Sequence, residues 1–176
     1  MHNINSNIFL IGMMGSGKTT IGRILARKMK KQFIDSDHEI ELRTGAKIPL
    51  IFEIEGEIGF RKREAKVISE LTSLKNIVLA TGGGVILSEK NRRFLKERGI
   101  VVYLQASVNS LVQRTSYDSN RPLIKSKNPK SSIEKLIFQR KSLYEEIADI
   151  KLESGRPNVQ LLVQKIITTL NKEQFK

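Results

Sequence analysis

One segment constrains the fold of this chain more than any other, a glycine-rich stretch between an apolar run and an amphipathic one. It reads Gly12-Met13-Met14-Gly15-Ser16-Gly17-Lys18-Thr19, the pattern G-x-x-x-x-G-K-T, between residues 8–11 and 21–29. The flanking patterns predict a buried strand, a tight turn and a helix. In that setting the glycines let several backbone N–H groups point inward at one anion. We therefore predict a nucleotide phosphate site, against the alternative of a glycine turn that binds nothing.

Two side chains at the end of this motif suit a nucleotide and its metal ion. Lys18 adds a full positive charge, and the predicted helix presents its positive N-terminal end at the same place. The Thr19 hydroxyl is suited to a Mg²⁺ ion that is shared with the nucleotide phosphates. The motif thus predicts both a nucleotide and Mg²⁺ as ligands.

Length and composition indicate one compact domain over residues 1–176. The 176 residues are 39% hydrophobic, which is enough for one core and leaves too little chain for a second domain. There is no cysteine, which excludes disulfides and cysteine-ligated metals. The start lacks the basic and apolar regions of a signal peptide, and no apolar stretch approaches membrane-spanning length. We therefore expect a cytoplasmic protein with no membrane partner.

The net charge of +13 raises the question of a nucleic-acid partner. Lysine and arginine outnumber aspartate and glutamate by 31 to 18. The excess is scattered along the chain instead of gathered on one helix face, and aromatic residues, at 6%, offer little for base stacking. Small polyanionic substrates explain the sign of the charge equally well. We therefore expect no nucleic-acid partner.

Short apolar runs rich in β-branched residues alternate with segments of helical periodicity, which indicates a parallel sheet flanked by helices. Ser88 is placed to cap a helix, Gly45 and Gly99 are placed to end helices, and Ser131 begins a capping box with Glu134. Strands are predicted at residues 7–11, 32–35, 76–80, 100–104 and 149–153, and helices at residues 19–30, 61–74, 88–98, 107–114, 132–147 and about 159–170.

Two stretches do not fit this alternation. Residues 37–60 mix short helices with polar turns, and Pro49 suits the first turn of one of these helices. Residues 115–130 form a long polar segment interrupted by prolines, and such long connections are uncommon in a compact domain. Phosphoryl transfer requires that water be kept from the γ-phosphate, and Arg121 lies within this second stretch. We interpret it as a lid, against the alternative of disorder.

Two carboxylates follow the second predicted strand, in Asp35-Ser36-Asp37. The carboxyl ends of strands in such sheets face the ligand crevice, and alternation along an extended chain would send Asp35 and Asp37 the same way. One carboxylate near Thr19 could hold a metal-bound water, and the other could accept a hydrogen bond or a proton from an attacking hydroxyl. The alternative for Asp37 is the N-cap of the helix that follows.

A run of three glycines, Gly82 to Gly84, follows the third predicted strand. Without side chains, another group can approach this backbone closely, and the exposed N–H groups could bind a carboxylate or a hydroxyl. The alternative is a flexible turn. Arginine side chains are also candidates, because their planar fork matches the oxygen pairs of carboxylates and phosphates. Three arginines stand in notable contexts: Gly59-Phe60-Arg61, Arg121-Pro122-Leu123 and Gln139-Arg140-Lys141.

Several segments occur in a fixed order: GMMGSGKTTIGR, DSD, RTG, FEIEGEIGFRKRE, TGGG, VVYL, RPLI and an R-x-x-L-Y-x-x-x-A-D run at residues 140–149. Through this series, residues 7–170 resemble the shikimate kinase family. The resemblance implies an α/β, three-layer P-loop kinase fold with a five-stranded parallel sheet in the order 2-3-1-4-5 and a mobile lid. It also implies a monomeric kinase of aromatic amino-acid biosynthesis that transfers the γ-phosphate of ATP to the 3-hydroxyl of shikimate.

The same resemblance implies roles for individual residues. Thr19 would ligate Mg²⁺, with Asp35 in the metal's outer shell through a water. Asp37 would bind the shikimate hydroxyls as the candidate base, and Arg121 would stabilise transition-state charge over the ATP phosphates. Two arginines would clamp the substrate carboxylate, and Ile48, Phe52 and Phe60 would form an apolar wall for its ring or serve as ordinary core residues. The implied sets are Gly15, Ser16, Gly17, Lys18, Thr19, Thr20, Arg114, Arg121 and Arg156 for ATP; Asp37, Arg61, Gly82, Gly83, Gly84 and Arg140 for shikimate; and Lys18, Asp37 and Arg121 for catalysis.

The chain departs from the family's pattern at few places. Thr19 stands where many members have serine, and Pro49 stands where a small residue is expected. Arg156 and Pro157 are adjacent here instead of slightly separated, which concerns the adenine loop.

Three other functions compete with this one. A related kinase of another small hydroxy acid, such as gluconate, would share the phosphate machinery but should lack the pair Arg61 and Arg140 together with TGGG. A nucleic-acid-binding protein would use the basic surface, with an affinity that falls steeply with salt. A non-catalytic relative is disfavoured because Lys18, Asp37 and the three arginines are all present.

Overall fold

The computed structural model describes residues 6–115, 128–154 and 158–173. Their strands form one parallel sheet in the order β2-β3-β1-β4-β5, which confirms the fold class and strand order expected from the sequence. The strands are β1 (Asn7–Ile11), β2 (Gln32–Asp35), β3 (Ile77–Ala80), β4 (Gly99–Gln105) and β5 (Ile150–Glu153).

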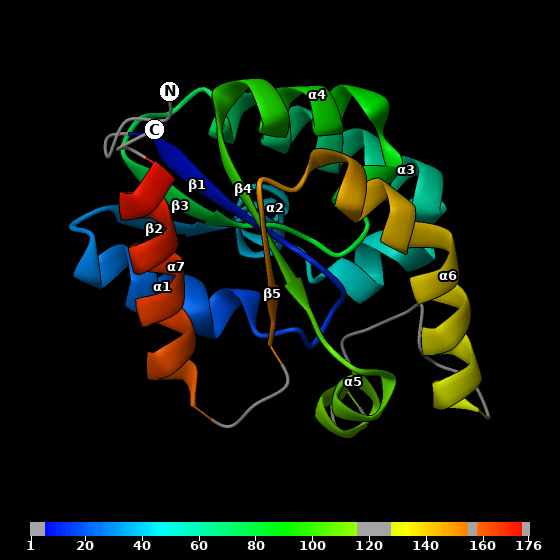
Figure 1. The fold of residues 1–176 in the computed structure, drawn as a ribbon. Helices are drawn as coiled ribbons and strands as arrows, with labels where there is room; N and C mark the ends of the chain where they lie inside the picture. Colours follow the sequence, from blue (N-terminus) through cyan, green and yellow to red (C-terminus); the bar gives the residue numbers. More distant parts are fainter. Residues whose placement is uncertain (1–5, 116–127, 155–157, 174–176) are drawn as a thin grey trace.

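Helices connect successive strands and cover both faces of the sheet (Figure 1). They are α1 (Lys18–Lys28), α2 (Ser36–Thr44), α3 (Ile48–Leu71), α4 (Glu89–Arg98), α5 (Val108–Thr115), α6 (Pro129–Ile147) and α7 (Val159–Glu173), with a short 3₁₀ helix η1 (Val85–Leu87). Helices α1 and α7 pack on one face, and α3, α4 and α6 pack on the other. Within the described ranges, no helix combines the length and apolar character needed to cross a membrane.

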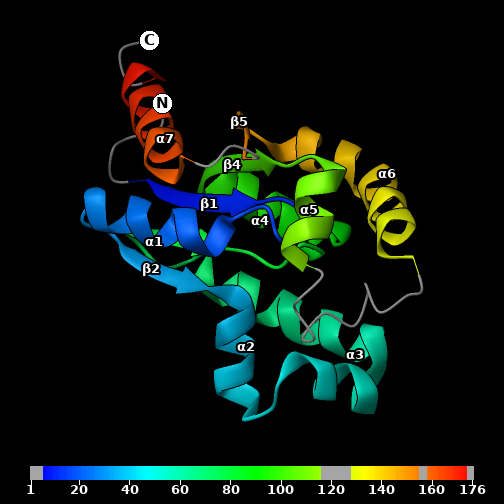
Figure 2. The same ribbon diagram turned by 90° about the horizontal axis from the view of Figure 1, so that it is seen from below.

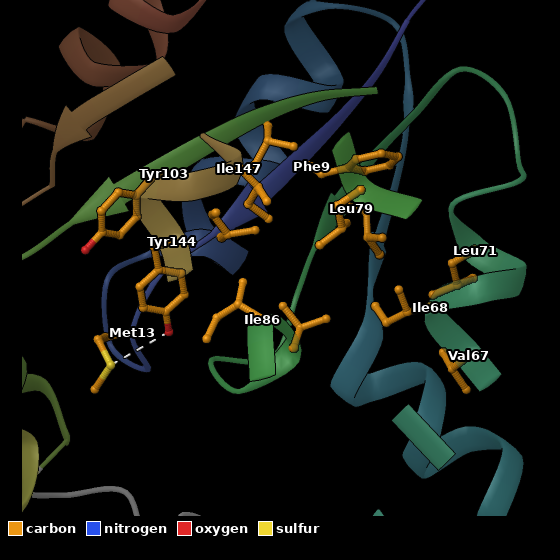
Figure 3. Packing of buried hydrophobic residues seen from close by; sticks show 14 of the residues in the cluster. Phe9, Met13, Val67, Ile68, Leu71, Leu79, Ile86, Tyr103, Tyr144 and Ile147 are labelled. Carbon is orange, nitrogen blue, oxygen red and sulfur yellow. Dashed lines mark hydrogen bonds between the residues drawn. The ribbon is translucent and has the colours of Figure 1, made fainter. Parts of the chain in front are cut away.

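The sequence of β1 shows why both faces of the sheet are buried. Its five residues, NIFLI, are all buried. Successive side chains of a strand point to opposite faces, so Ile8 and Leu10 join the core under α1 and α7, while Phe9 and Ile11 join the core under α3, α4 and α6. Figure 3 shows part of this second core, in which Phe9 lies near Leu79. A continuous apolar run with two buried faces is typical of parallel sheets.

The main difference from the predicted elements is α3. The sequence predicts a helix at residues 61–74, whereas α3 begins at Ile48 and ends at Leu71. Gly56 has φ +67° and ψ −178°, a conformation that breaks the helix inside these bounds. The short helix expected around Pro49 and the helix expected from residue 61 are thus parts of one element with a break at Gly56. Pro49 lies in the first turn, as predicted.

The helix ends confirm two local predictions and correct two others. Gly45 ends α2 with φ +67°, and Ser88 caps α4. Gly99 was expected to end α4 in the left-handed conformation, but its φ is −177° and it begins β4. Ser131 does not cap α6, because the cap is Asn128, whose side chain accepts a hydrogen bond from the Ser131 N–H at 3.2 Å.

The predicted lid is described only at its two ends. Thr115 is the last residue of α5, and Asn128 to Lys130 form the cap and first turn of α6. Residues 116–127, with Arg121, lie outside the described residues, as do Arg156 and Pro157.

Candidate functional site

The candidate site lies at the carboxyl edge of the sheet, where β1, β2 and β3 end. Figure 2 shows the arrow of β1 pointing toward α5, with the phosphate loop between them. A cavity of about 460 Å³ opens there. Ligands in open parallel sheets bind at this edge. Its lining includes Gly15, Ser16, Gly17, Lys18, Thr19, Thr20, Asp35, Asp37, Thr81, Gly83, Arg114 and Ser154.

The phosphate loop has the conformation that its glycines permit. Gly15 and Gly17 have φ of +80° and +93°, a region that residues with a side chain rarely adopt. Lys18 follows, and its ammonium donates hydrogen bonds of 2.8 Å to the carbonyls of Gly12 and Met13. The positive end of α1 and the Lys18 charge therefore meet in one loop, which is the arrangement that favours a bound phosphate.

Asp35 connects this loop to α2. Its Oδ2 accepts a hydrogen bond of 2.7 Å from the Thr19 hydroxyl, and its Oδ1 accepts hydrogen bonds from the N–H groups of Asp37 (3.0 Å) and His38 (3.2 Å). Asp35 is thus the N-cap of α2, which corrects the alternative that gave this role to Asp37. A hydroxyl and a carboxylate in contact are oxygen donors that suit Mg²⁺, so Thr19 and Asp35 fit the predicted metal.

Asp37 lines the cavity from a helix, and not from the end of a strand as the sequence had indicated. Side-chain alternation along an extended chain was expected to aim Asp35 and Asp37 the same way, but β2 ends at Asp35 and Asp37 lies in the first turn of α2. Both carboxylates nevertheless line the cavity, as predicted. The conclusion is confirmed, although the expected geometry was wrong.

Each glycine of the Gly82–Gly84 turn gives room to a different group. A β-carbon at Gly82 would lie 2.7 Å from Oδ1 of Asp37 and 2.9 Å from Oε1 of Glu64. A β-carbon at Gly84 would overlap the guanidinium of Arg61. Side chains of α2 and α3 therefore approach the turn closely, which supports the predicted close approach and not the flexible-turn alternative.

Arg61 lies between two carboxylates of its own helix. Its Nη1 donates to Oε2 of Glu64 at 2.8 Å, and its Nη2 and Nε donate to Oε1 of Glu57 at 3.0 and 3.3 Å. Burial disfavours the charged guanidinium, but the two carboxylates outweigh this effect and raise the pKa of Arg61. The residue is therefore a fixed positive charge beside the glycine turn.

Arg140 provides a second positive charge from another helix, α6. The residue is 2% exposed, and its Nη1 has no hydrogen-bond partner among the described residues. The same is true of Oε1 of Glu64. Burial raises the pKa of Glu64, while the charges of Arg61 and Arg140 both lower it, so the three groups act on one another. Buried polar atoms are normally paired, so the spare donor and acceptor indicate a place prepared for a polar ligand.

Arg114 lies on the other side of the phosphate loop. Its Nη1 donates to the carbonyls of Gly15 at 3.0 Å and of Ser154 at 3.3 Å, and so joins the loop to the end of β5. The structure places Arg114 in the cavity lining, and its position near an adenine remains a prediction.

Several residues of the site were missed in the sequence. Ser36 accepts a hydrogen bond of 3.0 Å from the Gly82 N–H. Glu57 and Glu64 hold Arg61, and their spacing of four and three residues from it on a helix is a signal that could have found them. Phe52 and Phe60, expected as core or as a ring-binding wall, pack 4.7 Å apart against the core under α3, and the wall remains a prediction.

Comparisons with known proteins agree with this geometry. A family model described as shikimate kinase matches residues 14–171. The chain belongs to the shikimate kinase family. The shikimate kinase of Nitrosococcus oceani is 54% identical over 169 residues, which cover 96% of this chain and 89% of that protein. The structure of the shikimate kinase from Acinetobacter baumannii in complex with shikimate is 50% identical, with a TM-score of 0.96 over 98% of this chain and 96% of that one.

A solved structure from the rival enzyme class has the same fold as this shikimate kinase family member. A gluconokinase structure from Sinorhizobium meliloti has a TM-score of 0.64 at 17% identity, over 97% of this chain and 94% of that one. Identity at this level shows a common fold and carries no conclusion on substrate. Of the features that the rival was expected to lack, Arg61 on α3 lies beside the glycine turn, and the charge of Arg140 on α6 acts on the same carboxylate, that of Glu64.

Proposed function

We propose that this chain transfers the γ-phosphate of ATP to the 3-hydroxyl of shikimate, giving 3-phosphoshikimate and ADP. One observation carries the proposal beyond the family assignment. The buried Arg140 has a spare donor, Glu64 has a spare acceptor, and Arg61, paired with Glu64, lies beside a glycine turn that is close to the phosphate loop. This arrangement provides an anion site within reach of a nucleotide site.

The substrate would bind through its carboxylate and its hydroxyls. Arg61 and Arg140 would clamp the carboxylate, since guanidinium groups match its two oxygens. Backbone groups of Gly82, Gly83 and Gly84 would line the ring. Asp37, which is packed against Gly82, would accept a hydrogen bond from the reacting hydroxyl. The apolar ring needs no specific polar partner.

The nucleotide would bind along the phosphate loop. Backbone N–H groups from Gly15 to Thr20 would hold the phosphates, and the Lys18 ammonium would exchange its carbonyl partners for phosphate oxygens. Thr19 and Asp35 would hold Mg²⁺, directly and through water, and the bound ion neutralises charge on the phosphates. Arg114, Arg121 and Arg156 would contact ATP, with Arg121 stabilising the charge that develops during transfer.

Chemistry would depend on orientation more than on covalent steps. Phosphoryl transfer passes through a loose transition state, in which the attacking and leaving oxygens lie roughly in line. Asp37 would aim the hydroxyl at the γ-phosphorus and hold its proton as the new O–P bond forms. Lys18 would stabilise the negative oxygens of the transferred group.

The substrate is tested with a coupled assay of ADP release, using purified protein, ATP, Mg²⁺ and a panel of hydroxy acids. Shikimate should produce ADP well above the ATP-only background, whereas gluconate and quinate should not. ADP release that depends on another acid and not on shikimate would contradict the proposal.

The role of Asp37 is tested with Asp37→Asn. Phosphate transfer should fall by about 10²- to 10⁴-fold, because the amide cannot take a proton, while ATP affinity changes little. Turnover and nucleotide binding by calorimetry are measured separately. Glu39→Gln is the matched control, since Glu39 lies on the same helix and pairs with Arg43 instead of lining the cavity. A large loss of ATP affinity would place Asp37 in the nucleotide site.

A further inference from the structure

Tyr144 is a buried residue of α6 that the proposed reaction does not yet use. It lies one helical turn after Arg140 and is 0% exposed. Its ring stacks on that of Tyr103, with centroids 4.9 Å apart and an interplanar angle of 19°. Figure 3 shows its hydroxyl pointing away from this stack, toward Met13 of the phosphate loop. The ring therefore packs in the core, while the hydroxyl points from the core toward the functional site.

The Tyr144 hydroxyl has three neighbours at the functional site, namely Gly83, Met13 and the Arg140 side chain, with which it also interacts through a hydrogen bond. It donates a hydrogen bond to the carbonyl of Gly83, and it lies 3.7 Å from the sulfur of Met13. A thioether is a weak acceptor, so the single hydroxyl proton goes to the carbonyl. Burial raises the pKa of Tyr144 well above its ordinary value, although the charge of Arg140 opposes this effect. The hydroxyl thus remains a donor throughout the pH range in which an enzyme of this kind works.

Gly83 is the point where the two halves of the site meet. A β-carbon there would lie 3.1 Å from the backbone nitrogen of Met14 and 3.5 Å from the carbonyl of Gly12, so the glycine is pressed against the phosphate loop. Its neighbours in the chain pack on Asp37 and on Arg61. A rotation of the Gly83 peptide would therefore move the substrate groups relative to the phosphate groups.

We propose that Tyr144 is a positioning residue for the reaction, which holds the Gly83 peptide so that the substrate pocket and the phosphate loop keep their relative position. The inference rests on the proposed function, because it assumes that the Gly82–Gly84 turn binds the phosphate acceptor. Arg140 and Tyr144, both on α6, then act on the same substrate. Arg140 binds the substrate carboxylate, and Tyr144 positions the glycine turn that contacts the substrate.

The competing explanation is that Tyr144 only fills the core, and Tyr103 provides the control that separates the two. Its ring belongs to the same stack and is also buried, at 4% exposure. Its hydroxyl makes no hydrogen bond to the described residues. Tyr103→Phe and Tyr144→Phe thus remove the same atom from the same stack, and only Tyr144→Phe removes the hydroxyl that contacts the Gly83 carbonyl and Arg140.

The test compares steady-state kinetics and thermal unfolding of the two variants with the unmodified protein. For Tyr144→Phe, KM for shikimate should rise by about 5- to 10-fold and kcat should fall, because loss of one hydrogen bond to a buried carbonyl releases the turn. KM for ATP should stay within about two-fold, because the phosphate loop keeps its own hydrogen bonds. Tyr103→Phe should leave KM and kcat for both substrates within about two-fold of the unmodified values.

Three outcomes would overturn the inference. One is an unchanged KM for shikimate in Tyr144→Phe. Another is an equal rise in Tyr103→Phe, which would mean that the stack matters and not the hydrogen bond. The third is failure of Tyr144→Phe to fold while Tyr103→Phe folds, which would assign the hydroxyl to stability.

Arg140→Ala, measured in parallel, separates this inference from the proposed function. Its KM for shikimate should rise by about 10- to 100-fold, as expected for loss of a charged hydrogen-bond donor. If Arg140→Ala left this KM unchanged, the proposed substrate site would be wrong. If Arg140→Ala raised it and Tyr144→Phe did not, only the role of Tyr144 would be lost.

Discussion

Arg61 has two carboxylate partners whose surroundings differ. The Glu64 side chain is 1% exposed, whereas that of Glu57 is 46% exposed. Glu57 accepts from both Nε and Nη2, the edge of the guanidinium that could grip a carboxylate with two parallel hydrogen bonds. In the unliganded protein, Glu57 thus occupies an edge that the substrate carboxylate would need. We expect Glu64 to hold Arg61 in place and Glu57 to compete with the substrate.

Glu57→Gln tests this competition. KM for shikimate should fall by about two- to four-fold with kcat unchanged, because the exposed ion pair that must be broken is weak. Glu55→Gln is the matched control, since Glu55 pairs with Arg63 and not with Arg61. A rise in KM for Glu57→Gln would show instead that Glu57 pre-orients Arg61.

At the scale of elements, one arginine joins α2 to α3. Arg43, near the end of α2, donates to Glu39 on its own helix at 2.7 Å and to Glu70 near the end of α3. These helices carry Asp37 and Arg61, so their packing sets the distance between two proposed substrate contacts. The hydrogen bond from Arg43 holds the pKa of Glu70 below its ordinary value of 4.5.

This lowered pKa predicts how the contact responds to pH. Because the folded-state pKa of Glu70 is depressed, its stabilisation is complete above 4.5 and is lost as the pH falls through the folded-state value. Glu70→Gln should lower the unfolding midpoint at pH 7 by at most about 2 °C, and the difference should vanish once the pH lies below the folded-state pKa. Glu53→Gln, which removes a carboxylate of α3 that has no ion pair to the described residues, is the matched control. A constant difference between Glu70→Gln and the unmodified protein across this range would contradict the assignment.

At the scale of the whole molecule, local sequence patterns predicted the individual residues of the site but not how these residues lie relative to one another. The bounds of β1 and β2 and the phosphate loop follow from apolar runs and glycines, which are contiguous in the sequence. The strand order came only from family resemblance. Arg61 and Glu64 lie on α3 and Arg140 lies on α6, and the two helices cover the same face of the sheet. In the sequence Tyr144 cannot be distinguished from an ordinary core residue, and only the fold places its hydroxyl beside Gly83. The periodicity of one helix or strand does not predict which residues of a distant element it will contact.

The net charge of +13 is a property of the whole molecule, and it should affect how strongly the protein attracts anionic substrates. ATP and shikimate are both anions, and a positive protein raises their local concentration through interactions that salt screens. When the salt concentration rises from about 0.05 to 0.3 M, the screening length shortens from roughly 14 to 6 Å, so KM for ATP should rise by about two- to five-fold. The value of kcat should change less, because Lys18, which would contact the transferred phosphate, is buried, and salt screens buried charges little. Potassium chloride and potassium acetate should act alike if screening is the cause. A KM that does not respond to salt would mean that the pocket alone determines affinity and that the scattered lysines and arginines do not assist binding.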